Sequence, residues 1–191
     1  MKVLDLFSGS GSWTKPYSVN DIIISIDINK EFNPSICIDI LEWDYSNMEK
    51  NIDIIYSSPP CNLYFTKLKT RNGIRKFTEN DVNISKKFVE KTIEIINYFN
   101  PKYYVIENPI GKMQVIYPYI FHKIYDVIDY CMYGLRYKKS TAIWTNIPIE
   151  FKRCLHNYHI DDVQNLSNSK DRGIIAPGLV NEIYTKMKNG Y

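Results

Sequence analysis

Short apolar runs separated by polar or glycine-containing segments are the main pattern in the first half of the chain. The runs are rich in β-branched and aromatic residues, and each ends near a polar residue or a glycine, which is typical of buried strands. We predict strands at residues 2–7, 22–27, 35–39, 52–57 and 103–107. Because these runs alternate with helix-like or loop segments, the pattern indicates an α/β fold with a mostly parallel sheet.

A helical period replaces the strand pattern between residues 83 and 99. Lysines and glutamates occupy one face of this segment, which is typical of an amphipathic helix. The opposite, apolar face is formed by Phe88, Val89, Ile93, Ile96 and Phe99. The pair Asn100-Pro101 ends the helix, because a residue before proline disfavours helical geometry. A last helix is predicted to begin near Pro177 and to turn inward Leu179, Val180, Ile183 and Met187.

The stretch between these two helices predicts a hairpin followed by a polar excursion. Residues 127–133 and 141–146 are predicted strands joined across residues 134–140, and residues 157–172 are polar and predict a loop. No linker or repeat divides the chain, so we expect residues 1–191 to form a single domain. We expect its sheet to carry helices on both faces and to include a C-terminal β-hairpin.

Composition narrows the class of protein without identifying a function. The chain has 191 residues, of which 45% are hydrophobic, so we expect a folded protein. It contains no apolar run long enough for a transmembrane helix, so we expect no membrane partner. Its cysteines occur singly, without a CxxC pair: Cys37, Cys61, Cys131 and Cys154. This spacing favours a reducing, intracellular location, cytoplasmic or, in a eukaryotic host, nuclear. A net charge of +3 is too mild to indicate nucleic-acid binding by itself.

The first predicted strand runs into a turn that contains Gly9 and Gly11, where the backbone can pass close to a ligand. Asp27 ends the second strand, about twenty residues downstream, where a carboxylate is expected to accept hydrogen bonds from ribose hydroxyls. Asp39 ends the third strand and is placed to accept one from an adenine amino group. The simpler interpretation is a tight turn with surface aspartates. Together, however, the three strand ends favour a nucleoside cofactor.

The fourth predicted strand ends in a rigid turn, Pro59-Pro60-Cys61. The two prolines restrict the backbone and hold the thiol in place. Ligands of such sheets bind beyond the carboxyl ends of the strands, so we expect Cys61 to face the same crevice as the glycine turn. Glu107, at the end of the fifth strand, is a candidate acid or hydrogen-bond partner there. The alternatives are a buried structural cysteine and a helix-capping or ion-paired glutamate.

These segments, in this order and at this spacing, resemble the cytosine-5 DNA methyltransferases. The first resembles the family's motif for S-adenosylmethionine (SAM), the second its catalytic proline-cysteine motif, and the third its ENV motif, with Pro109 in place of valine. The three segments are Phe7-Ser8-Gly9-Ser10-Gly11, Pro59-Pro60-Cys61 and Glu107-Asn108. The resemblance covers residues 1–146 and, more loosely, the last helix, and it implies the Rossmann-like fold of class I SAM-dependent methyltransferases.

The resemblance implies a mechanism and a cofactor. Cys61, as a thiolate, would add to C6 of cytosine, so that C5 becomes nucleophilic and takes the methyl group from SAM. Glu107 would hold the ring at N3 and the exocyclic amine. A base would then remove the C5 proton, and Cys61 would leave. The SAM site would be lined by Phe7, Gly9, Gly11, Asp27, Ile28, Asp39 and Pro60.

Residues 133–141 resemble the basic motif that follows a Tyr-Gly pair in the family, in a form closest to a Lys-Pro-Thr variant of viral and phage members. By register Lys139 takes the place of a basic residue that contacts the base or a phosphate, although an exposed basic hairpin is an equal alternative. Residues 61–83 lack a clear period and carry several lysines and arginines. They predict either a mobile lid over a phosphate backbone or a solvated loop.

The sequence departs from the family where a target-recognition domain is expected. Only residues 147–176 separate the basic motif from the last helix, so specificity is expected to be low, to come from a short loop, or to come from a protein partner. DNA is the favoured substrate and RNA a possible one. The alternatives are a SAM-binding accessory subunit without catalysis, and an enzyme acting on free nucleotides. Within this insert Cys154, His156 and His159 offer three metal ligands, but no fourth is evident, so no metal site is predicted.

Overall fold

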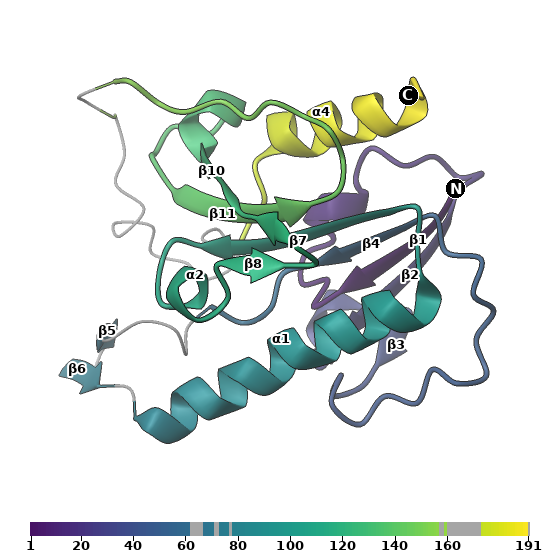
Figure 1. The fold of residues 1–191 in the computed structure, drawn as a ribbon, viewed down its shortest axis with the longest axis horizontal. Helices are drawn as coiled ribbons and strands as arrows, with labels where there is room; N and C mark the ends of the chain where they lie inside the picture. The colour runs from purple at the N-terminus through teal and green to yellow at the C-terminus, as the bar shows by residue number, and fades with distance from the viewer. Residues whose placement is uncertain (62–66, 71–72, 77, 157–158, 160–172, 191) are drawn as a thin grey trace.

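A seven-stranded sheet forms the centre of the computed structural model, which describes residues 1–61, 67–70, 73–76, 78–156, 159 and 173–190 (Figure 1). The strand order is β10-β11-β7-β4-β1-β2-β3. Strands β3, β2, β1, β4 and β7 are parallel, whereas β11 runs antiparallel to both of its neighbours. The bounds are β1 Lys2–Leu6, β2 Ile22–Asp27, β3 Ile36–Cys37, β4 Ile54–Ser57, β7 Tyr103–Pro109, β10 Asp126–Asp129 and β11 Ser140–Thr145.

The predicted mostly parallel sheet and its C-terminal hairpin are confirmed, with differences at the ends of the strands. β3 keeps only two of the five residues predicted for it. The strand predicted at 127–133 ends at Asp129, because Tyr130–Tyr133 turns into the 3-10 helix η4, which closes on Gly134 with a φ of 95°. The hairpin partners are nevertheless as expected, since Asp129 pairs with Ser140 across β10 and β11.

One long helix covers each face of the sheet (Figure 1). Side chains alternate along each strand, so Leu4 and Leu6 of β1 join the cluster packed against helix α1 (Glu79–Phe99), whereas Val3 joins the cluster against helix α4 (Pro177–Lys188). The predicted start of the first helix, residue 83, was wrong. The first turn of the helix is polar, so the spacing of apolar residues does not reveal it. A capping box between Thr78 and Asp81 starts the helix at Glu79.

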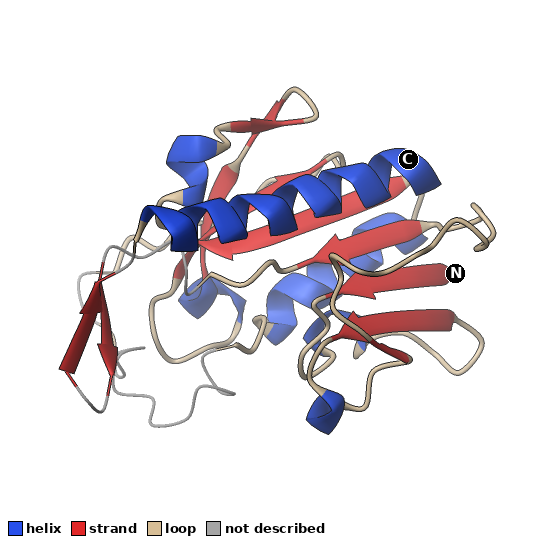
Figure 2. Ribbon diagram, turned by 90° about the horizontal axis from the view of Figure 1, so that it is seen from below, coloured by secondary structure: helices blue, strands red, loops and turns tan. Residues whose placement is uncertain are grey.

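The connecting segments contain short elements that the hydrophobic pattern did not reveal. Residues 61–83 were predicted to lack secondary structure, yet the structure places a hairpin there, β5 (Lys67–Thr70) with β6 (Gly73–Lys76). Figure 2 shows this hairpin on the side to which the parallel strands point. The other short elements are η1 Ser12–Thr14, η2 Lys30–Phe32, α2 Met113–Ile116, β8 Tyr119–Ile120 and β9 Lys123–Ile124. Among the described residues no helix is long and apolar enough to cross a membrane.

Helix α4 lies so close to η4 that one position admits only glycine. A Cβ on Gly178 would lie 2.7 Å from the carbonyl oxygen of Tyr133. We therefore expect Gly178→Ala to lower the free energy of unfolding by about 1–3 kcal/mol, the usual cost of overpacking, although alanine is the better helix former by about 1 kcal/mol. Urea unfolding measures the difference. Asn181→Ala, at an exposed position of the same helix, is the control and should be neutral or stabilising; equal stability of both variants would contradict the close approach.

Candidate active site

The turn after β1 has an unusual backbone that explains its two glycines. Gly9 and Gly11 have φ angles of +49° and +66°, which residues other than glycine rarely adopt. Phe7 also has a positive φ of 57°, so the chain reverses sharply at the end of the strand. The Gly9 amide donates a hydrogen bond of 2.8 Å to a carboxylate oxygen of Asp27, at the end of β2. Two of the three strand ends that were predicted to hold a nucleoside are thus joined directly.

A cavity of about 240 Å³ opens beside this turn. Five of the seven residues predicted for the cofactor line it: Phe7, Asp27, Ile28, Asp39 and Pro60. The other wall residues are Ile26, Ile38, Ile40, Ser58 and Phe88. Gly9 and Gly11 are not part of its lining, but Gly9 is tied to it through Asp27. The side chain of Ile28 is 69% exposed at its rim, an apolar surface that a flat ring would cover.

The aspartates of the cavity are held in place by backbone amides. Asp27 accepts hydrogen bonds from the amides of Gly9 and Asn29, both at 2.8 Å, and Asp39 accepts one from the amide of Leu41 at 3.0 Å. Each carboxylate oxygen has a second lone pair, so these contacts orient the carboxylates without using up their capacity to accept. The wall therefore combines apolar and aromatic side chains with fixed acceptors.

The segment Pro59–Cys61 lies between this cavity and strand β7. Pro60 contributes to the cavity wall. On the other side, the side-chain amide of Asn108 donates a buried hydrogen bond of 2.8 Å to the carbonyl oxygen of Pro59. Cys61 follows directly and is half-buried. The bond to Asn108 thus fixes the cysteine segment to the residue next to Glu107.

Glu107 is buried within a group of polar side chains from the end of the sheet. Its Oε1 accepts a hydrogen bond of 2.9 Å from the hydroxyl of Tyr130 and lies 3.9 Å from Nζ of Lys139. The same Nζ lies 4.7 Å from the centre of the Tyr130 ring. Burial, followed by the charge of Glu107, raises the pKa of Tyr130 well above its ordinary value. The phenol therefore stays protonated and donates to the carboxylate.

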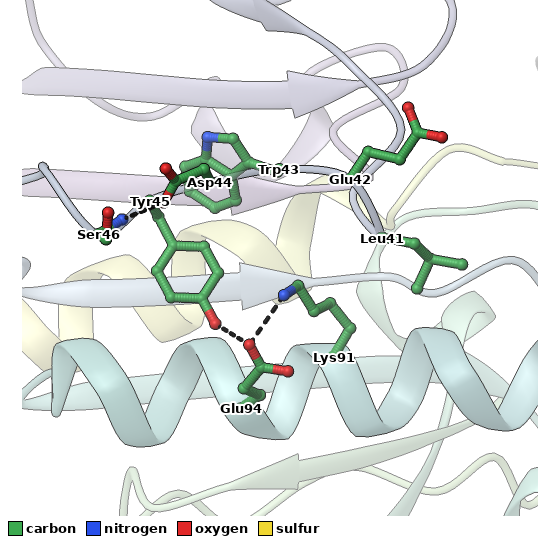
Figure 3. Close-up of a pocket in the computed structure, with 8 residues that line it drawn as sticks. All are labelled: Leu41, Glu42, Trp43, Asp44, Tyr45, Ser46, Lys91 and Glu94. Atoms are coloured by element: carbon green, nitrogen blue, oxygen red, sulfur yellow. Dashed lines mark hydrogen bonds and ion pairs between the residues drawn. The ribbon is translucent and has the colours of Figure 1, made fainter.

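A second hollow, of about 380 Å³, lies elsewhere, between residues 41–46 and helix α1 (Figure 3). Its polar groups pair with one another: Glu94 accepts from the hydroxyl of Tyr45 and from Nζ of Lys91, the latter at 2.8 Å. None of the residues predicted for the site lines it. It is therefore a surface depression above an ion pair.

Comparison with known proteins connects this geometry to a family. Over 160 residues the chain is 34% identical to the "Probable DNA (cytosine-5)-methyltransferase" of Frog virus 3 (isolate Goorha). That match covers 77% of this chain and 71% of the viral protein. The chain belongs to the DNA (cytosine-5)-methyltransferase family. Enzymes of this family take their methyl group from SAM.

The fold is that of a class I, Rossmann-like methyltransferase, as expected. The solved structure of the methyltransferase EhMeth of Entamoeba histolytica has the same fold, with a TM-score of 0.52 at 19% sequence identity. This likeness covers 82% of the present chain but 57% of EhMeth, so the chain spans little more than half the length of that protein. No protein-family model matches the chain.

Two residues of the candidate site were not predicted in their observed roles. Asn108 was noted only as part of the ENV-like segment, and its bond to Pro59 joins residues 49 positions apart. Tyr130 was assigned to a strand and carries no local signal, because it meets Glu107 only after η4 turns it toward β7. Lys139 was expected at a base or a phosphate. The structure places it against Glu107, with only 11% of its side chain exposed.

Asp5 is a buried carboxyl at the centre of the methyltransferase sheet. It is fully buried in β1, and neither of its carboxyl oxygens has a hydrogen-bond partner among the described residues. Burial, with a smaller contribution from the charge of Asp27, raises its pKa to about 8. The unfolded chain releases this proton near pH 4. The folded protein therefore binds one more proton than the unfolded chain between these pH values, and this group lowers stability as the pH rises from about 4 to about 8.

Asp5→Asn removes this titration and keeps the shape of the side chain. Relative to the wild type, we expect the variant to gain stability with rising pH, with a slope of up to about 1.4 kcal/mol per pH unit between pH 4 and 8. Urea unfolding at several pH values gives this difference. Asp44→Asn is the control, because hydrogen bonds from Ser46 lower the pKa of that exposed carboxyl. It is ionised in both the folded and the unfolded chain above about pH 5, so its difference from the wild type should stay constant from there to pH 8. Parallel curves for Asp5→Asn and wild type would disprove the assignment.

Proposed function

We propose that this chain transfers a methyl group from SAM to C5 of cytosine in DNA, with Cys61 as the nucleophile. The observation that carries the proposal is the hydrogen bond between Asn108 and Pro59. It ties the cysteine segment to the strand end that bears Glu107, and Pro60 of the same segment borders the nucleoside-sized cavity. The name of the viral relative supports the same reaction and the same substrate class.

The cavity fits the nucleoside part of SAM. Its volume of about 240 Å³ is below the range of a complete ligand site, so we assign it to the adenosine and expect the amino-acid part to pass over the turn of Gly9 and Gly11. Asp27 would accept from the ribose hydroxyls, Asp39 from the adenine amino group, and Phe7 and Ile28 would cover the ring. When bound, SAM supplies an activated methyl group on a sulfonium.

The chain's own residues would then act on the cytosine ring. The thiolate of Cys61 forms a bond to C6, and the electron pair of the C5–C6 double bond moves to C5, which takes the methyl group. Glu107, held by Tyr130 and Lys139, would accept a hydrogen bond from the exocyclic amine and give a proton to N3, where electron density accumulates. A base removes the C5 proton, the double bond re-forms, and the bond between C6 and sulfur breaks to return the thiolate.

We further propose that this chain is a compact, single-domain member of the family, similar to viral and phage forms. The insert at residues 147–176 replaces a full target-recognition domain, so specificity would come from a short loop or from a protein partner. In duplex DNA the target cytosine must leave the stack before a thiol can reach C6. The predicted lid at residues 61–83 lies partly outside the described residues, and we retain it as a proposal on the side where hairpin β5–β6 lies.

Two measurements on the full chain test the function. Radiolabelled SAM should transfer label to cytosine in duplex DNA. DNA that contains 5-fluorocytosine should trap a covalent complex that survives denaturation. A base cannot remove fluorine from C5 as it removes a proton, so the bond between C6 and sulfur stays. Single-stranded DNA, RNA and free dCTP are compared in the same assay. Transfer to RNA or to dCTP alone would overturn the DNA assignment. Binding of SAM without methyl transfer and without a covalent complex would contradict the proposed enzymatic activity and favour a SAM-binding accessory subunit.

A further inference from the structure

We propose that Cys131, Cys154, His156 and His159 bind one structural zinc ion beside the active site. The first ligand belongs to the 3-10 helix η4, and the other three belong to the segment that follows β11. The sequence showed the last three as possible metal ligands but offered no fourth ligand. The structure supplies a fourth ligand, because the fold brings η4 and this segment together although Cys131 and Cys154 are 23 positions apart.

The distances suit a tetrahedral metal site. The Sγ atoms of Cys131 and Cys154 and a ring nitrogen of His159 all lie within 4.8 Å of one another. Sγ of Cys154 lies 3.2 Å from Nε2 of His159. Around zinc, with Zn–S near 2.3 Å and Zn–N near 2.0–2.1 Å, tetrahedral angles separate sulfur and nitrogen by about 3.6 Å. Only small side-chain shifts would therefore place these three atoms around one ion.

His156 is the fourth ligand in this proposal. Its Nδ1 lies 3.3 Å from Sγ of Cys154, and its side chain is exposed, so a change of rotamer can direct the ring to the common centre. The backbone amide of His156 donates to the same sulfur at 3.3 Å. Two thiolates and two imidazoles are a common ligand set of structural zinc.

A buried carboxylate holds the two halves of the site in place. Asp129, the last residue of β10, lies two positions before Cys131. It accepts hydrogen bonds from the amide of Cys154 at 2.9 Å, from Nε of Arg153 at 3.0 Å and from the hydroxyl of Ser140 at 2.6 Å. The position of Cys154 relative to η4 is therefore fixed by groups other than the proposed ligands. Such outer contacts typically orient the ligands of metal sites.

The proposed ion has a structural role, because four protein ligands leave no open position for chemistry. It would connect η4 to the start of the insert at residues 147–176. Cys131 directly follows Tyr130, which donates to Glu107. The ion would thus anchor the insert next to the polar group around Glu107.

Metal content of the full chain tests the proposal independently of catalysis. The protein is purified under reducing conditions without chelators, and zinc is measured by mass spectrometry of the elements. We expect one zinc ion per chain. Replacement of zinc by Co²⁺ should give the strong visible bands of a tetrahedral site and a sulfur-to-cobalt charge-transfer band. These spectra need no variant, so they remain informative if a substitution disturbs folding.

Matched variants assign the ligands. Cys131→Ser and Cys154→Ser should each lose the bound ion and the charge-transfer intensity, and His156→Gln and His159→Gln should each weaken Co²⁺ binding by at least about tenfold. Cys37→Ser changes an exposed cysteine outside the cluster and should keep full metal content. Circular dichroism verifies that each variant is folded. Absence of zinc and of cobalt bands in the wild type, retention of metal in Cys154→Ser, or a Cys131–Cys154 disulfide in the protein as isolated would overturn the proposal.

Discussion

Cys61→Ser is expected to lower the rate of methyl transfer by at least about three orders of magnitude, because an alcohol is a far weaker nucleophile than a thiolate. The change removes only the reactivity of the sulfur and leaves the Pro59–Asn108 bond intact. Single-turnover transfer from labelled SAM measures the rate. The denaturation-resistant complex with 5-fluorocytosine DNA should disappear in the same variant.

Cys37→Ser is the matched control for this experiment. The same atom changes at an exposed position of β3, so activity should remain within about twofold of wild type, as for most surface substitutions. Calorimetry should give similar SAM affinities for both serine variants and the wild type. If Cys61→Ser retained activity or still trapped the fluorinated DNA, another residue would be the nucleophile and the proposed mechanism would be wrong.

Glu107→Gln is expected to lower kcat by about 10²–10⁴-fold, the range typical of acid–base groups. Glutamine still accepts the hydrogen bond from Tyr130, so the local structure should persist. Its neutral amide, however, cannot give a proton to N3, where electron density accumulates when the thiolate of Cys61 adds to C6. Lys139, 3.9 Å from the carboxylate in the wild type, would also lose this ion-pair partner. Steady-state kinetics with duplex DNA separate the effects on kcat and KM.

Glu42→Gln serves as the control for Glu107→Gln, because Glu42 lines the hollow of Figure 3 and lies outside the cavity of the proposed site. It should leave kcat and KM unchanged. A Glu107→Gln variant that raised only KM would show that Glu107 contributes to DNA binding and not to the chemical step. Activity equal to wild type would remove Glu107 from the mechanism.

Local patterns predicted the parts of the fold that depend on consecutive residues. The end of β1 just before Phe7, the end of β2 at Asp27 and the proline-cysteine turn were all predicted. They follow from short apolar runs and from residues with restricted or unusual backbones. Helix α1 was predicted from its apolar face, but its start at Glu79 depends on a polar capping box, which adds no apolar position to the period.

Contacts between distant segments were beyond the sequence patterns. Tyr130 contacts Glu107 because the 3-10 helix η4 ends the strand at this point. The apolar residues of 127–133 are compatible with a continuous strand as well as with a strand followed by a helical turn, so the sequence did not reveal this change. The same turn brings Cys131 to Cys154, although the spacing of the four cysteines in the sequence gives no sign of it. The hydrogen bonds of Tyr130 and Asn108 join residues 23 and 49 positions apart. They depend on how whole helices and strands pack, which the preferences of single residues cannot predict.

The antiparallel ladder between β7 and β11 has a consequence for how this protein can vary. Ile143 lies opposite Glu107 and Thr141 lies opposite Pro109, so the separation between Glu107 and Lys139 is set by strand pairing. The intervening chain, from Ile110 to Lys138, closes a loop whose length does not enter that separation. Natural variants can therefore lengthen or shorten the β8–β9 tip, where both strands are short, while the acidic and basic groups keep their mutual distance.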